Sequence, residues 1–165
     1  MRKITERIAT SLSFVLIALM ALIVIDVTWQ VFTRFVLKQP SGFTEELAGF
    51  LLIWIGLLGA SYTYYRKAHL GIDTLVANWT GGRKLAAELG VAAVVFLFAL
   101  LIMVVGGIRL LTITFTLKQI SPAMKLPMGY IYSVLPLSGV LFMYFSVAAM
   151  VDTLAQRGSA GASGS

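Results

Sequence analysis

Four long apolar stretches constrain the fold of this chain more than any other feature of its sequence. They run from about residue 8 to 31, 47 to 65, 85 to 108 and 128 to 151. About 20 residues of α-helix cross a hydrocarbon layer of roughly 30 Å, so each stretch is long enough to span a membrane. Lipid offers backbone groups no hydrogen-bond partners, which favours helices over any open structure. The sequence therefore predicts an all-α integral membrane protein with four transmembrane helices.

The composition agrees with this prediction. Of 165 residues, 59% are hydrophobic and 12% are charged, whereas a soluble domain carries about 25% charged residues. The formal net charge is +6, but the Lys and Arg residues lie at the edges of the apolar stretches, where they report membrane orientation. We therefore expect contact with lipid and no binding of nucleic acid.

The counts of cysteine and histidine limit the possible cofactors. The chain has no cysteine and one histidine. A disulfide framework, a Cys-ligated metal and a bis-histidine haem site within the chain are thereby excluded. We expect no cofactor and no metal.

The first apolar stretch resembles a secretory signal peptide at its start. Arg2, Lys3 and Arg7 form a positively charged segment before it. The apolar run is too long for a signal peptide, however, and it ends at Asp26 and Trp29 instead of a small-residue cleavage site. We expect it to be retained as a helix.

Orientation follows from the Lys and Arg residues in the short loops. Eight lie at the N-terminus, in the loop between the second and third stretches and in the tail, and five lie on the other side. The positive-inside rule then places both termini in the cytoplasm. The loop 67–84 is predicted to hold a short amphipathic helix in the interface. Residues 1–157 are expected to form one transmembrane domain, and 158–165 a flexible low-complexity tail.

Polar residues gather near the outer ends of the first two stretches. Asp26, Gln30 and Arg34 are spaced four residues apart and share one helical face, and Glu45 and Glu46 begin the second span at the same depth. An ion pair from Arg34 to either glutamate would join the helix ends. Burying polar groups in a membrane is costly, so the cluster is a candidate ion or substrate site. The favoured interpretation is structural: a network that holds the helices together, or a polar face at the interface with a partner subunit.

His69 and Asp73 are also one helical turn apart. Histidine titrates near neutral pH, so a proton relay is conceivable there. A local hydrogen bond in an exposed loop, or a place in the structural cluster, is the commoner role for such a pair.

The second stretch carries small residues that allow helices to approach closely in lipid. These candidate packing positions are Gly49, Gly56, Gly59 and Ala60. No phosphate-binding loop, metal-ligand cluster, nucleophilic triad or dinucleotide motif accompanies them. The chain is therefore predicted to be an accessory subunit and not an enzyme.

The order of motifs resembles a known family of membrane proteins. The series that carries the resemblance is Arg34-Phe35, Pro40, Phe43-Thr44-Glu45-Glu46, Trp54, Arg66-Lys67-Ala68-His69 with Asp73, and the segment from Ser121 to Tyr130. It is similar to the small membrane subunit (DctQ type) of tripartite ATP-independent periplasmic transporters, known as TRAP transporters, from about residue 5 to 155. A tryptophan is common before the paired glutamates, and Phe43 keeps an aromatic side chain there.

The resemblance implies a place in a three-part uptake system of the bacterial inner membrane. A large multi-span subunit (DctM type) would hold the substrate and sodium sites, and a soluble periplasmic binding protein would deliver an organic acid such as a dicarboxylate or sialic acid. The small subunit would brace the large one and help dock the binding protein. The candidate docking residues in the outer loops are Lys38, Gln39, Ser41, Lys118 and Gln119.

Two other functions stay open from the residues alone. A membrane anchor of a respiratory enzyme would hold haem between helices, but His69 is the only histidine available. A self-sufficient oligomeric channel or exporter would show flux without a partner. Against that function, the intramembrane polar residues gather at one end and do not line a path.

Overall fold

The computed structural model describes residues 2–39, 41–68 and 82–162 of the chain. Within them lie four helical segments that are long and apolar enough to cross a membrane, which confirms the all-α fold with four spans. The predicted amphipathic helix falls mainly on residues 69–81, outside the described residues. The helices of the described residues are α1 (Arg2–Phe35), α2 (Gly42–Ala68), α4 (Gly82–Phe98), the π-helix η1 (Ala99–Gly106), α5 (Gly107–Thr116), α6 (Met128–Tyr132) and α7 (Val134–Ala162).

The helix ends extend beyond the predicted spans. The third span is made of α4, η1 and α5, and the fourth of α6 and α7. Helix α7 continues through residues 158–162, the first part of the segment expected to be a flexible tail.

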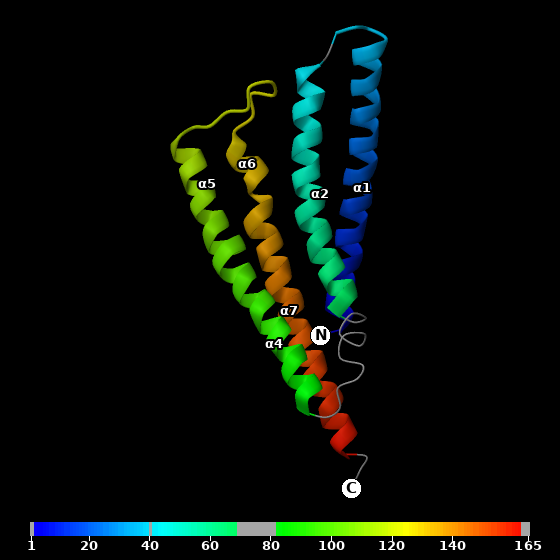
Figure 1. Ribbon diagram of the computed structural model, residues 1–165, viewed down its shortest axis with the longest axis vertical. Helices are drawn as coiled ribbons and strands as arrows, with labels where there is room; N and C mark the ends of the chain where they lie inside the picture. Colours follow the sequence, from blue (N-terminus) through cyan, green and yellow to red (C-terminus); the bar gives the residue numbers. More distant parts are fainter. Residues whose placement is uncertain (1, 40, 69–81, 163–165) are drawn as a thin grey trace.

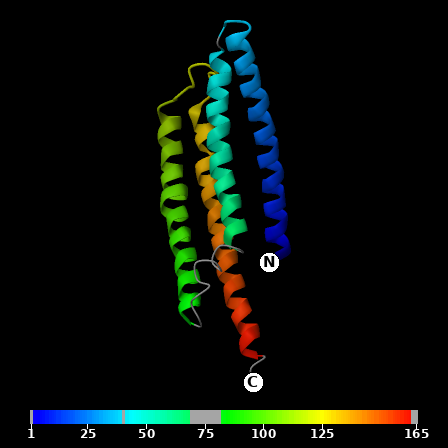
Figure 2. The same cartoon turned by 45° about the vertical axis from the view of Figure 1, so that its right-hand side comes forward.

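The four spans form a layer. Helix α1 packs along α2, α2 along α7, and α7 along α4 and η1, whereas α1 meets α7 only slightly. Both views show α1 at one edge and the α4–α5 segment at the other (Figures 1 and 2). We call the end that carries the two connections 36–41 and 117–127 the loop end, and the opposite end, where both termini lie, the terminal end. A layer of this kind has two broad faces and little enclosed core.

A seam of side chains along α1 explains its contact with α2 and, near the terminal end, with α7. The seam residues recur every three or four positions, the spacing that produces coiled-coil-like packing between helices. All of them are buried or half-buried: Thr5, Ala9, Leu12, Leu16, Leu19, Ile23, Asp26, Gln30 and Thr33.

The buried core is formed by three of the four spans. Leu12, Leu58, Val134 and Phe145 form a cluster between α1, α2 and α7. Around it lie half-buried aromatic and aliphatic side chains of the same three helices.

The third and fourth spans are interrupted where they pack closely against each other. Pro136 lacks an N–H, and its ring would clash with the carbonyl of Tyr132, the residue at which α6 ends. A Cβ at Gly107 would lie 2.9 Å from Pro136 Cδ, and one at Gly139 would lie 2.8 Å from Met103 Cβ. These two glycines, which the sequence analysis did not select, therefore allow η1 and α5 to pack on α7.

Candidate functional site at the loop end

The carboxylate of Glu46 links α2 to the connection between the third and fourth spans. Its Oε2 accepts a short hydrogen bond from the hydroxyl of Ser121. The same oxygen accepts the backbone N–H of Ala123 at 3.1 Å and that of Met124 at 2.8 Å. We call this set of four residues the Glu46 clamp. It joins segments about 75 positions apart in the sequence.

The connection is shaped as a tight turn closed by its own backbone. Ile120 and Pro127 pair as an antiparallel bridge. The N–H of Ser121 donates to the carbonyl of Leu126 at 2.9 Å, and the N–H of Lys125 donates to the carbonyl of Ser121 at 3.0 Å. Lys125 completes the turn in a left-handed conformation with φ of 54°. These backbone bonds shape the turn, and Glu46 attaches it to α2.

The turn presents two successive backbone N–H groups to one acceptor. Consecutive N–H groups in a turn form a concavity that binds anions, and a carboxylate hydrogen-bonded to such donors makes stronger bonds than a neutral acceptor would. A Cβ added at Gly42 would lie 3.8 Å from the Cβ of Ala123, so the first turn of α2 lies beside the loop. The start of α2 thus carries the carboxylate that accepts these N–H groups of the loop.

A second polar link joins α2 to α6, farther into the membrane. The indole N–H of Trp54 donates to the carbonyl of Ile131 at 3.1 Å. Because Ile131 immediately precedes the end of α6, this bond fixes α6 against α2 beside the interruption. Trp54 therefore contacts a neighbouring helix.

The polar residues predicted to share one face of the first span are divided by the structure. Asp26 is 7% exposed and Gln30 is half-buried, both in the seam of α1, whereas Arg34 is exposed. Among the described residues, Asp26 Oδ2 has no hydrogen-bond partner. The hydrogen bonds of Glu46 go to the loop and not to Arg34, and Glu45 is exposed. The ion pair suggested by the sequence is therefore not the link between the helix ends.

Of the residues selected as candidate docking positions, Lys38 and Gln39 follow the end of α1. Both are exposed, and Lys38 has a left-handed conformation with φ of 53°. The N–H of Gln39 donates to the carbonyl of Thr33 at 3.2 Å. The half-buried Ser41 precedes α2, and its carbonyl accepts the hydroxyl of Thr44 at 2.9 Å. Their backbones thus shape the turn between α1 and α2, while the two long side chains face solvent.

Lys118 and Gln119 have the same role at the end of α5. Lys118 has a φ of 47°, and its N–H donates to the carbonyl of Phe115 at 3.1 Å. The N–H of Gln119 donates to the carbonyl of Thr114 at 3.2 Å. This pair of bonds is the Schellman arrangement that ends many helices. Both side chains are exposed at the loop end.

Comparison with known proteins identifies the family. Residues 23–156 match the model of the DctQ component of the tripartite ATP-independent periplasmic transporters. The chain belongs to this family. The match contains the whole Glu46 clamp and leaves most of α1 outside it. As a DctQ component, the chain is a transporter subunit, which is a non-enzymatic role.

Two relatives, both TRAP transporter small permease proteins, match this chain over different numbers of residues. The sialic acid TRAP transporter small permease protein SiaQ of Vibrio cholerae is 35% identical over 72 residues, which cover 44% of this chain and 40% of the relative. A protein of Haemophilus influenzae described as a TRAP transporter small permease protein is 23% identical over 158 residues, or 93% of this chain and 94% of the relative.

The small residues of this DctQ chain lie partly on an uncovered face of α2. Among the described residues, no atom would lie within 4 Å of a Cβ added at Gly49 or Gly56, and Ala60 is exposed. Gly59 instead faces α1, where an added Cβ would lie 3.9 Å from Leu16 Cδ2. Their packing against a partner helix stays a prediction. His69 and Asp73 lie outside the described residues.

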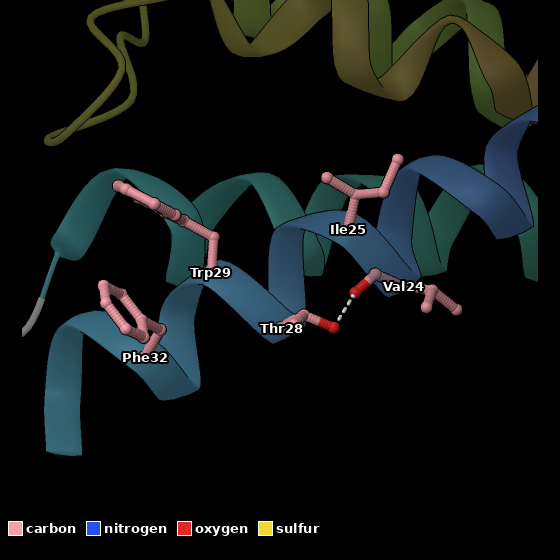
Figure 3. A pocket seen from close by; sticks show the side chains of 5 residues that line it. All are labelled: Val24, Ile25, Thr28, Trp29 and Phe32. Carbon is pink, nitrogen blue, oxygen red and sulfur yellow. Dashed lines mark hydrogen bonds between the residues drawn. The ribbon is translucent and has the colours of Figure 1, made fainter. Parts of the chain in front are cut away.

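The exposed face of α1 near the loop end is apolar and slightly hollowed. Val24, Ile25, Thr28, Trp29 and Phe32 line an open hollow of about 440 Å³ (Figure 3). The rings of Trp29 and Phe32 lie 5.7 Å apart, and the hydroxyl of Thr28 donates to the carbonyl of Val24 at 2.6 Å. This surface holds no ionisable group, so it suits lipid or an apolar partner and not catalysis. Within the described residues, no three His, Cys, Asp or Glu side chains are placed to hold a metal ion.

Proposed function

We propose that the chain is the small accessory membrane subunit of a sodium-coupled TRAP transporter that takes up an organic acid. In this role it braces a large multi-span subunit that carries the substrate and sodium sites. The observation that supports the proposal best is the DctQ match across residues 23–156. The name of the Vibrio cholerae relative suggests sialic acid as one substrate to test, with dicarboxylates as the other class.

The layered fold suits a bracing subunit. Between 11% and 28% of the most apolar part of each span is buried within the chain, so most of that surface is left for lipid and for another protein. Without a hydrophobic force between helices in lipid, association depends on close packing and polar links. The chain has both kinds of link within itself, and its uncovered small-residue face on α2 offers close packing to a partner.

Orientation is part of the same proposal. With both termini on the cytoplasmic side of a bacterial inner membrane, the loop end faces the periplasm. The exposed side chains of Lys38, Gln39, Lys118 and Gln119 then meet the soluble binding protein, together with the half-buried Ser41. Basic side chains at such a surface steer and orient a partner more than they add affinity.

Docking by the loop end predicts an effect of charge reversal on transport. In vesicles that contain the complete transporter, Lys38→Glu or Lys118→Glu is expected to raise the concentration of binding protein needed for half-maximal uptake several-fold. Leu37→Ala, a neutral change at an exposed residue beside Lys38 and outside the docking set, is the control. Uptake curves that coincide for all variants would contradict a docking role for these lysines.

The proposed function is tested by purification of the tagged chain from its native membrane in mild detergent, followed by mass spectrometry. A large multi-span membrane protein is expected to co-purify in a fixed ratio. Purification of the chain alone, together with solute flux through liposomes that contain only this chain, would overturn the proposal in favour of a channel.

A further inference from the structure

Helix α1 carries a second stripe of side chains opposite its buried seam. Lys3, Arg7, Thr10, Phe14 and Ile17 recur at alternating spacings of four and three residues, and all are exposed. The stripe is cationic for its first two turns and becomes apolar by the fourth. This change from cationic to apolar side chains matches the change from headgroups to acyl chains across one membrane leaflet.

The cationic part of the stripe surrounds a surface hollow. Lys3, Glu6, Arg7, Thr10 and Ser11 line an open space of about 450 Å³. Two cations and one carboxylate give the hollow a net positive charge. The hydroxyl of Thr10 donates to the carbonyl of Glu6 at 2.8 Å, so the charged donors for an anion are the ammonium of Lys3 and the guanidinium of Arg7, with the hydroxyl of Ser11 beside them. Arginine binds phosphate with two parallel N–H groups, and lysine binds it as a point charge.

The depth of this hollow follows from the apolar run beside it. The first predicted span, from about residue 8 to 31, has a length of roughly 36 Å, enough to cross the hydrocarbon layer. Arg7 then lies about 19 Å and Lys3 about 25 Å from its middle along the helix, at the level of lipid headgroups. Phe14 is 67% exposed and Ile17 is 65% exposed at the depth of acyl chains.

We propose that this hollow binds the phosphate of an anionic phospholipid in the leaflet at the terminal end, with the acyl chains lying along Phe14 and Ile17. The charge of the hollow selects an anionic headgroup, and the continuous apolar track selects a lipid over a free phosphate. The residues concerned precede the family match, which begins at residue 23. The site is therefore independent of the proposed function.

Lipid retention by the full-length chain tests the proposal. The chain is reconstituted with phosphatidylcholine and a minor fraction of phosphatidylglycerol, re-extracted in mild detergent and analysed by mass spectrometry for both lipids. We expect phosphatidylglycerol to be enriched over phosphatidylcholine. We expect the K3Q/R7Q variant to reduce this enrichment by about tenfold, since each Lys or Arg near an anionic lipid surface adds to the attraction between chain and lipid.

The control variant R34Q/K125Q removes two exposed charges at the loop end and is expected to retain phosphatidylglycerol as the parent does. Size-exclusion chromatography of both variants shows whether the chain is folded. Equal enrichment in K3Q/R7Q and the parent, or equal losses in both double variants, would overturn the proposal. Displacement of the lipid by excess inorganic phosphate would also overturn it, because the hollow would then bind a phosphate group without any contribution from acyl chains along Phe14 and Ile17. Co-purification of a large partner is measured separately, so failure of the lipid site can be distinguished from failure of the proposed transporter function.

Discussion

The two ends of the contact between α2 and the α6–α7 segment are held by different chemistry. Near the terminal end, Phe145 is 1% exposed and its ring lies 5.1 Å from that of Tyr65. The hydroxyls of Tyr64 and Ser146 are hydrogen-bonded at 3.2 Å in the same region. At the loop end, one carboxylate, that of Glu46, collects three donors from a single turn.

The difference follows from the partner at each end. Near the terminal end two helices lie side by side, and apolar packing with neutral hydrogen bonds links them. At the edge of the membrane a carboxylate can keep part of its hydration and still order a loop. Stability at the terminal end is therefore spread over many side chains, whereas the loop end depends on one residue.

Removing a core side chain should have the largest effect on the whole chain. Phe145→Ala leaves a cavity among α1, α2 and α7, and we expect a loss on the order of 3 kcal/mol in the free energy of unfolding. Unfolding in mixed detergent micelles, followed by circular dichroism, measures it. The exposed Val147 provides the control, since Val147→Ala should change little. Similar losses in the two variants would mean that the core is not where the stability lies.

Glu46→Ala should have a large but local effect at the loop end. Without the carboxylate, the N–H of Ala123 loses its acceptor and the N–H of Met124 keeps only the Ser121 hydroxyl, 3.2 Å away, so the turn separates from α2. We expect faster cleavage of the 117–127 connection by added protease, with a smaller fall in overall stability than Phe145→Ala causes. The neighbouring exposed Glu45 is the matched control, and Glu45→Ala should leave cleavage unchanged. Cleavage that is the same in both variants would show that the clamp does not hold the loop.

Removing one neutral hydrogen bond near the terminal end should have the smallest effect. Tyr64→Phe keeps the aromatic packing against Phe142, whose ring lies 5.6 Å away, and removes the hydroxyl that contacts Ser146. We expect a loss of about 0.6 kcal/mol, the average for hydrogen bonds between membrane helices. The same unfolding experiment measures it. A loss as large as that of Phe145→Ala would contradict the view that stability is spread over this region.

The sequence predicted the spans because the length and polarity of apolar runs are local properties. It also placed Glu45 and Glu46 at the membrane edge, and the series of motifs identified the family. The periodic placement of Asp26 and Gln30 on one face of α1 was also accessible from their spacing. These features depend on neighbours within two helical turns.

The partner of Glu46 could not be read from the sequence in the same way. A carboxylate is attracted equally by a basic side chain such as Arg34 and by unpaired backbone N–H groups, and only the path of the chain decides between them. One signal was present: a turn between Ser121 and Pro127 has N–H groups in need of an acceptor at the depth of the paired glutamates. The close contacts at Gly107 and Gly139 were hidden because they depend on how two helices cross.

A disulfide between the start of α2 and the loop tests the central claim, that Glu46 holds the two together, most directly. The chain has no cysteine of its own. The Cβ positions of residues 42 and 123 are 3.8 Å apart, close to the mean for disulfides of about 3.8 Å. Cysteines are therefore introduced as G42C and A123C, and the free thiols are followed by maleimide labelling during mild oxidation.

The account predicts rapid and nearly complete loss of free thiols in the double-cysteine chain, with both single-cysteine chains as controls. It also predicts that addition of Glu46→Ala slows the loss several-fold, whereas addition of Glu45→Ala does not. Free thiols that persist in the double-cysteine chain, or the same oxidation rate with and without Glu46, would contradict it.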